Sequence, residues 1–310
     1  MSIYKEKIAF RKIRNFSETI GVASYFIKQN IGILLKAAAF IALPIVMIGF
    51  LGVGITSLGF IENATKSNID GLVGGLGMFY MAMFVMWLGL VLVMGCIYEY
   101  VVLYEQSEDF QAIKVGDISR NVFGHIGLYI GTTILLTVTL SVLFFFVFLF
   151  LGVFIFIHEV FIFFGTIGMI FVLSYIIIAL SNIYLIRIVE KRSFFDAFGR
   201  CFNLLEGHFG STLGLYFITS LISFSLLGLL PMIIQGVSLF FAETLMFETP
   251  ILFYALQIFY SLFYVGYNII YSVVISFRYF SLVEAKEGIG MLQKIEQIGQ
   301  HLSVENELDR

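Results

Sequence analysis

The sequence predicts an all-α polytopic membrane protein with six transmembrane helices, arranged as three helix-hairpin repeats with amphipathic helices at the cytoplasmic surface. Two observations lead to this fold class. The chain is 60% hydrophobic and 13% charged, and its apolar residues fall into long runs. Because soluble domains carry roughly 25% charged residues, a chain with about half that share must face lipid over much of its surface.

Six segments contain the roughly 20 apolar residues that a membrane-spanning helix needs. They are 37–60, 78–104, 126–157, 160–186, 209–241 and 250–277. Several exceed the minimum length, which predicts tilted or kinked helices. Pro44 and Pro231 lie inside the first and fifth segments and are the expected kink points.

The basic residues predict the orientation of the chain in the membrane. Of the 18 Lys and Arg residues, 17 fall in the terminal segments or in the connections that follow the second and fourth spans, and Lys66 lies on the opposite side. The positive-inside rule therefore places both termini in the cytoplasm. The basic N-terminal residues lack the apolar core of a cleavable signal peptide, so the first span is expected to direct insertion.

Two short sequence motifs that each occur three times predict an internal repeat. The first motif precedes each odd-numbered span and begins at Asn30, His125 and His208. The second motif ends each even-numbered span and finishes at Glu105, Glu190 and Glu284. The predicted repeats cover about 16–104, 112–189 and 193–284, and an amphipathic tail at 285–310 completes a single membrane domain, 1–310. Each repeat returns the chain to the cytoplasm, so the repeats share one topology.

Amphipathic helices are predicted at the cytoplasmic surface. The segment 193–206 lies between two apolar runs, and its polar residues, including Asp196 and Arg200, recur at three- to four-residue spacing opposite an apolar side. Apolar stripes also mark 17–29 and 288–302. Helices of this kind lie in the headgroup region with their apolar sides buried.

Charged residues near the ends of the spans are the first candidates for a functional site. Alignment of the repeats places Glu99 and Arg278 at equal depth, close to the cytoplasmic boundary. Charges within spans are costly unless they are paired or hydrated. An ion pair between these two residues is the simplest structural interpretation, with Arg187 as a competing partner for Glu99. An anionic substrate bound by Arg278 is the alternative.

A polar stripe marks the sixth span and is the second candidate. Its residues recur at three- to four-residue spacing: Gln257, Ser261, Tyr264, Asn268, Tyr271 and Ser272. Because polar groups in hydrocarbon are costly, the stripe is expected to face the bundle. It would form either a packed, hydrogen-bonded seam or the wall of a polar cavity.

Asn30, His125 and His208 occupy matching repeat positions at the membrane interface. We interpret them as hydrogen-bonding groups, because asparagine takes the position of the histidines and no HExxH or CxxC motif accompanies them. Cys96 and Cys201 are interpreted as packing residues. The sequence therefore predicts no catalytic residues, no metal site and no cofactor. The net charge of −3 gives no indication of a nucleic-acid partner.

Two stretches resemble a known family. Phe16-Ser-Glu-Thr-Ile with Phe26-Ile-Lys-Gln-Asn-Ile-Gly, and later Glu190-Lys-Arg-Ser-Phe-Phe-Asp-Ala-Phe with Leu205-Glu-Gly-His-Phe-Gly, are similar to the integral membrane domain of some bacterial glycerophosphodiester phosphodiesterases and its stand-alone relatives of unknown function. The resemblance implies a six-span helical fold in the bacterial inner membrane. It does not imply phosphodiesterase activity, because the soluble barrel domain that carries this chemistry has no counterpart here.

Two classes of function follow from these observations. The first is a non-enzymatic scaffold or accessory subunit of a membrane complex, whose partners are membrane lipids and a second protein or another copy of the chain. The second is a transporter or lipid-handling protein with a polar cavity along the sixth span. The chain has no GxxxxGK[ST] motif, so active pumping would need another subunit or an ion gradient.

Overall fold

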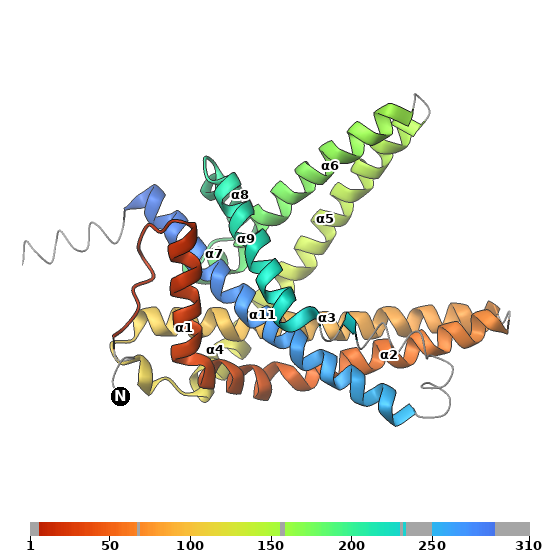
Figure 1. Cartoon of the computed structure of the whole chain (residues 1–310), viewed down its shortest axis with the longest axis horizontal. Helices are drawn as coiled ribbons and strands as arrows, with labels where there is room; N and C mark the ends of the chain where they lie inside the picture. Colours follow the sequence, from red (N-terminus) through yellow and green to blue (C-terminus); the bar gives the residue numbers. More distant parts are fainter. Residues whose placement is uncertain (1–5, 67–68, 156–158, 230–231, 234–249, 289–310) are drawn as a thin grey trace, which may run out of the picture. The chain divides into compact units, whose positions relative to one another are not determined.

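A computed structural model describes residues 6–66, 69–155, 159–229, 232–233 and 250–288. Within these ranges the regular secondary structure is entirely helical (Figure 1). Six of the described helices are long and apolar enough to cross a membrane. The structure thus confirms the predicted all-α fold with six candidate spans. The predicted tail helix at 288–302 lies outside the described residues, except for Gly288.

The helices have the following bounds. The N-terminal part contains α1 (Phe16–Ala37), a π-helical segment (Ala38–Ala42), α2 (Leu43–Thr65) and α3 (Ile69–Gln106). A 3-10 turn (Phe110–Ala112) leads to α4 (Val115–Gly124), α5 (Ile126–Ile155), α6 (Glu159–Leu180) and α7 (Ile183–Val189). The remainder contains α8 (Phe194–Leu205), α9 (Phe209–Ser223), a second π-helical segment (Phe224–Gly228) and α11 (Pro250–Glu287).

The first predicted surface helix and the first predicted span form one uninterrupted run of helical residues, 16–65. A boundary was expected between 29 and 37, but the helix instead widens into π geometry at Ala38–Ala42. Pro44 lies just beyond this segment. Proline has no N–H to donate to the carbonyl four residues earlier, so the local change in hydrogen bonding is explained by the proline. The apolar stripe at 17–29 predicted a helix but not where that helix ends.

The chain divides into two compact units. Unit 1 comprises residues 1–26, 137–216 and 274–310, and unit 2 comprises residues 27–136 and 217–273. The two units are defined by which residues contact one another. They do not test whether the chain is a single membrane domain or whether it contains three sequence repeats, so both remain predictions. Each unit is described on its own below.

In unit 2, α2 and α3 run side by side (Figure 1), and glycines let their backbones approach closely. A Cβ atom at Gly89 of α3 would lie 2.8 Å from the backbone N of Val46, and one at Gly49 of α2 would collide with the Cα of Met86. Small residues at helix contacts are typical of packing in lipid. The pair is therefore held by steric fit, with no charged group at these contacts.

In unit 1, the N-terminal segment packs against α11 through aromatic rings and arginines. Phe10 stacks on Phe277 with ring centroids 4.4 Å apart, and the guanidinium of Arg14 lies 5.3 Å from the centre of the Phe277 ring. Arg14 also donates to the carbonyl of Phe10 (2.8 Å), and its backbone N–H donates to Ser281 Oγ (3.0 Å). Burial lowers the pKa of Arg14, and its carbonyl acceptors compensate for part of the lost hydration.

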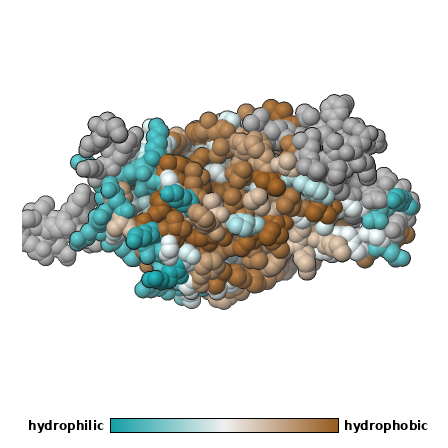
Figure 2. Space-filling view, turned by 90° about the horizontal axis from the view of Figure 1, so that it is seen from below, coloured by the Kyte–Doolittle hydropathy of each residue, from teal (hydrophilic) through white to brown (hydrophobic). Residues whose placement is uncertain are grey.

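Large apolar side chains remain exposed along the candidate spans. Phe40 is 77% exposed and Met81 71% exposed, and hydrophobic residues cover much of the face shown in Figure 2. Exposed apolar surface of this extent is unfavourable in water and favourable in a lipid environment. The burial pattern therefore supports a multi-pass membrane protein, in agreement with the length of the helices.

Candidate functional site

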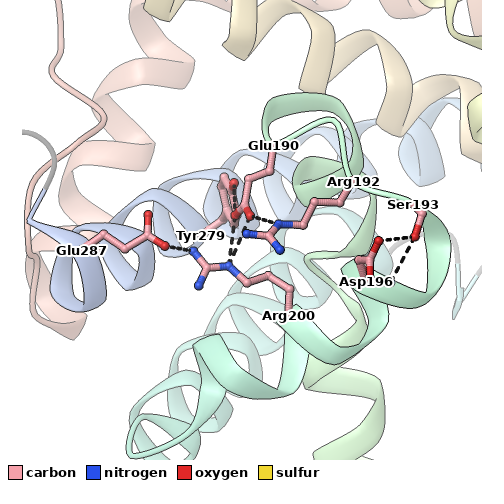
Figure 3. Close-up of polar contacts among 7 residues, drawn as sticks. All are labelled: Glu190, Arg192, Ser193, Asp196, Arg200, Tyr279 and Glu287. Atoms are coloured by element: carbon pink, nitrogen blue, oxygen red, sulfur yellow. Dashed lines mark hydrogen bonds and ion pairs between the residues drawn. The ribbon is translucent and has the colours of Figure 1, made fainter.

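A cluster of charged side chains joins α7, α8 and α11 in unit 1 (Figure 3). Glu190 ends α7, and Lys191 follows with a φ of 52°, in the left-handed region that reverses the chain direction. Ser193 then begins α8, and its hydroxyl accepts a hydrogen bond from the backbone N–H of Asp196 (3.3 Å). Serine is among the preferred residues at this position. This short turn places α8 beside the carboxylate that ends α7.

Glu190 is the centre of the cluster. Its carboxylate accepts hydrogen bonds from Arg192 Nε (2.6 Å), Arg200 Nε (3.3 Å) and Tyr279 Oη (3.1 Å). Arg200 reaches a second carboxylate, Glu287, through Nη2. The side chains of Arg200 and Glu190 are 12% and 16% exposed, so these charge-assisted contacts are only partly screened by water. The cluster fastens α8 to the end of α7 and to the last turns of α11.

The charge of Arg200 is stabilised by this environment. Burial lowers its pKa, but the carboxylates of Glu190 and Glu287 outweigh this effect, and the pKa of Arg200 is raised above its usual value. Cys201, the next residue, is fully buried. Burial and the nearby charge of Glu190 raise the pKa of its thiol to about 12. This thiol is therefore protonated and unreactive at neutral pH, as expected of a packing residue.

The outer face of α8 carries an open depression of about 480 Å³. It is lined by Arg192, Phe195, Asp196, Gly199, Arg200 and Asn203. Phe195 is 77% exposed, whereas Phe194 and Cys201 on the opposite side of the helix are buried. The polar spacing of the 193–206 segment pointed to this face. The same spacing gave no indication that Arg200 would be paired with Glu287, 87 residues later.

Arg278 lies in α11 and is 6% exposed. It donates to Thr212 Oγ1 from Nε (2.9 Å) and Nη2 (2.8 Å), to Ser211 Oγ from Nη2 (2.7 Å), and to the carbonyl of His208 (3.5 Å). All of these acceptors are uncharged. The start of α9 thus supplies a set of dipoles around a buried guanidinium.

His208 lies between this group and a surface ion pair. It is half-buried, and its pKa is lowered by burial and by the positive charges of Arg278 and Lys286. Lys286 is 3.5 Å from Glu206, whose side chain is 75% exposed. His208 is therefore neutral over most of the physiological range, and its backbone carbonyl serves as an acceptor for Arg278.

Glu99 lies in unit 2 and is 1% exposed. One of its carboxylate oxygens is 2.7 Å from His125 Nδ1 and accepts a hydrogen bond from Tyr129 Oη (3.1 Å). His125 follows α4 directly, and its side chain is 46% exposed. Glu99 and Arg278 each have these partners within their own unit, and the proposed pairing of the two stays a prediction. The repeat alignment did not reveal that the interfacial histidine is a partner of Glu99.

The remaining predicted residues lie as follows. Asn30 is buried and accepts a hydrogen bond from Tyr100 Oη (2.7 Å), and Arg187 is half-buried in the last turn of α7. Gln257 is buried on α11.

Two residues of the α11 stripe hydrogen-bond to their own helix. Ser261 Oγ donates to the carbonyl of Ile258 (2.6 Å), and Asn268 Nδ2 donates to the carbonyl of Tyr264 (2.8 Å). The Tyr264 and Tyr271 rings belong to a series, with Tyr260 and Tyr267, in which successive rings lie 6.1 to 6.4 Å apart and nearly parallel. Local bonding of this kind satisfies polar groups within a span.

The described residues contain no group of three or more His, Cys, Asp or Glu side chains arranged to hold a metal ion. Comparisons of the chain with protein-family models, with curated proteins and with solved structures found no match. The resemblance to the membrane domain of glycerophosphodiester phosphodiesterases therefore remains a prediction based on the quoted residues.

Proposed function

We propose that this chain is a non-enzymatic, multi-pass protein of the bacterial inner membrane that acts as a scaffold or accessory subunit of a membrane complex. The six apolar helices support the membrane assignment. The bias of basic residues supports cytoplasmic termini, and the resemblance described above supports the bacterial inner membrane.

The scaffold role is supported mainly by one observation: ion pairs hold α8 in place, and its exposed face carries the depression bordered by Phe195. Arg200 is held between Glu190 and Glu287, so α8 is fastened to α7 and α11 before any partner binds. An exposed aromatic ring, Phe195, borders the polar depression. Aromatic and arginine side chains on a preorganised surface are the usual anchors of protein contacts. The partner would be a membrane protein subunit or a second copy of this chain.

Substitution of Phe195 tests the scaffold role. Membranes containing the wild-type chain or Phe195→Asp are extracted in a mild detergent, and the size of the native assembly is measured by sedimentation. We expect the wild type in an assembly larger than the 35.1 kDa chain and the variant in a smaller one, with unchanged thermal stability. Phe123→Asp is the matched control, because Phe123 is also an exposed phenylalanine (52%) but lies outside the candidate spans and does not line the depression. Equal assembly sizes for wild type and Phe195→Asp would contradict the proposal.

The alternative is a transporter or lipid-handling protein with a polar cavity along α11. The donors of Ser261 and Asn268 are used by the backbone of their own helix, which supports a packed stripe over a hydrated path. Single cysteines at positions 261, 264, 268 and 271, probed with a small polar thiol reagent, distinguish the two. Reaction along the whole row would favour transport, and protection at all but the ends would favour the scaffold. Leu262→Cys is the lipid-facing control, because the Leu262 side chain is 46% exposed in the wild type.

A further inference from the structure

Arg278 differs from Arg200, the other arginine on the α8–α11 side of unit 1, in the nature of its partners. It is 6% exposed, and its hydrogen bonds go to two hydroxyls and a carbonyl. Among residues 159–229 and 250–288, no carboxylate forms an ion pair with it. Its Nη1 group donates no hydrogen bond within the same residues.

A guanidinium in this environment retains its positive charge. Hydroxyls and carbonyls orient the group, but they do not neutralise it, and a buried charge without a counter-ion is costly. Arg200 shows the usual solution in the same unit, because two carboxylates flank it. At Arg278 the counter-charge is missing from the described part of the chain, and a free pair of N–H donors is available to hold one.

Arg278 and Lys286 are two positive charges near His208, and both lower the pKa of that imidazole. The acidic partner of Lys286 is Glu206, which is 75% exposed and 3.5 Å from it. A pair so exposed to solvent contributes little, and Glu206 is not among the partners of Arg278. The start of α9, which carries Ser211 and Thr212, adds the partial positive charge of a helix N-terminus.

The position along the helices indicates which anion would reach this group. Arg278 lies nine residues before the end of the span Tyr254–Glu287, and Ser211 and Thr212 lie in the first turn of the span Phe209–Gly228. Residues near the ends of spans lie at the level of the lipid headgroups. An anion at this depth is most readily a phosphate that belongs to the membrane itself.

We propose that Arg278 binds the phosphate group of an anionic phospholipid headgroup, with Ser211 and Thr212 fixing the orientation of the guanidinium. Because Nε and Nη2 already donate to Thr212, Ser211 and His208, the two N–H groups of Nη1 are the ones that would donate to the phosphate oxygens. The site would anchor the end of α11 to a negatively charged lipid. It does not depend on the scaffold role, because the face of α8 lined by Phe195 is not part of it.

Thermal stability of the full-length protein in detergent tests the proposal. The protein is titrated with phosphatidylglycerol, with a diacylglycerol of the same acyl chains, and with inorganic phosphate at constant ionic strength. A ligand that binds the folded state raises the melting temperature. We expect phosphatidylglycerol to raise it and diacylglycerol to have no effect. Loss of a charge-assisted contact in Arg278→Gln should raise the half-saturating lipid concentration roughly tenfold or more.

Ser211→Asp provides a second test that does not remove the buried arginine. Ser211 is exposed, and a carboxylate at this position would lie beside Arg278 and occupy its donors. We expect this variant to be more stable without lipid and to lose the effect of phosphatidylglycerol. Arg200→Gln, whose arginine already has carboxylate partners and lies outside this site, should keep it.

Each outcome decides the proposal. An effect of phosphatidylglycerol that disappears in Ser211→Asp supports the headgroup site. An equal effect in wild type and Ser211→Asp, or an equal effect of diacylglycerol, overturns it. If inorganic phosphate alone stabilises the wild type and not Ser211→Asp, the site binds soluble phosphate and the lipid source is wrong.

Discussion

The α2–α3 pair of unit 2 and the charged cluster of unit 1 hold helices together by different means. Gly49 and Gly89 bring two apolar helices into backbone contact, and the contact contains no charge. In the cluster, Glu190 and Glu287 hold Arg200 and thereby fasten α8 to α7 and α11. The first contact depends on shape, and the second depends on charge.

This difference reflects the solvent that each region is expected to meet. Within hydrocarbon, lipid tails compete with apolar side chains, so close backbone packing by small residues is the effective way to join helices. Near the headgroups, water and charges are available, and ion pairs can form without the full cost of dehydration. The two regions should therefore respond differently to substitutions, to pH and to salt.

The largest effect is expected from Gly49→Val in the α2–α3 pair. A side chain at this position would collide with the backbone of Met86, and overpacking of this kind costs about 3 kcal/mol. Thermal unfolding in detergent measures the loss. Gly59→Val in the same helix is the matched control, because nothing lies within 4 Å of a Cβ atom at that position. Equal stability of the two variants would show that the close contact is not needed.

Glu190→Gln should destabilise the charged cluster by about 2 kcal/mol, since three donors lose their charged acceptor. Glu206→Gln, at a side chain that is 75% exposed, should change stability little. Added salt should reduce the difference between wild type and Glu190→Gln, because ions screen the partly exposed pairs. The loss in Gly49→Val should not depend on salt. The same salt dependence in both regions would contradict the comparison.

The pH dependence of stability provides a third test. The folded protein lowers the pKa of His208 below its ordinary value of 6.5, so the unfolded chain binds the proton more readily. Stability should therefore be unaffected by this residue above pH 6.5 and should fall as the pH drops from 6.5 toward the lowered pKa. Melting temperatures at pH 7.5 and 5.5 measure the fall. His208→Gln should lose less stability over this interval, and Lys286→Gln should show an intermediate response. An identical loss in wild type and His208→Gln would refute the assignment.

The smallest effect is expected from Glu287→Gln. The carboxylate of Glu287 is 37% exposed, and its removal alone should cost less than about 1 kcal/mol, because Arg200 keeps Glu190. In the Glu190→Gln background the same substitution should cost more, since Arg200 then loses both counter-charges. A double-mutant cycle measures this coupling, and strictly additive losses would show that the two carboxylates act independently.

The sequence predicted the helical fold and the number of spans because long apolar runs determine both. It predicted less well where helices join, since the stripe at 17–29 looks the same whether the helix stops or continues into a span. Partners were the hardest to predict. Arg200 and Glu287 are 87 residues apart, and no spacing rule connects them. The repeat alignment related Glu99 to Arg278 only by their predicted depth in the membrane. The contacts of Glu99 with His125 and Tyr129 depend instead on how α3 packs against the start of α5, which a sequence alignment does not contain.

Cysteine labelling in intact cells tests the central claim most directly, namely that the charged cluster and its α8 surface face the cytoplasm. Asn203 on α8 and Asp70 at the start of α3 are both exposed, and each is replaced by cysteine in a chain lacking Cys96 and Cys201. A membrane-impermeant thiol reagent should label position 70 and leave position 203 unlabelled until the membrane is permeabilised. Labelling of position 203, but not of position 70, in intact cells would contradict the orientation and the proposed cytoplasmic role of α8.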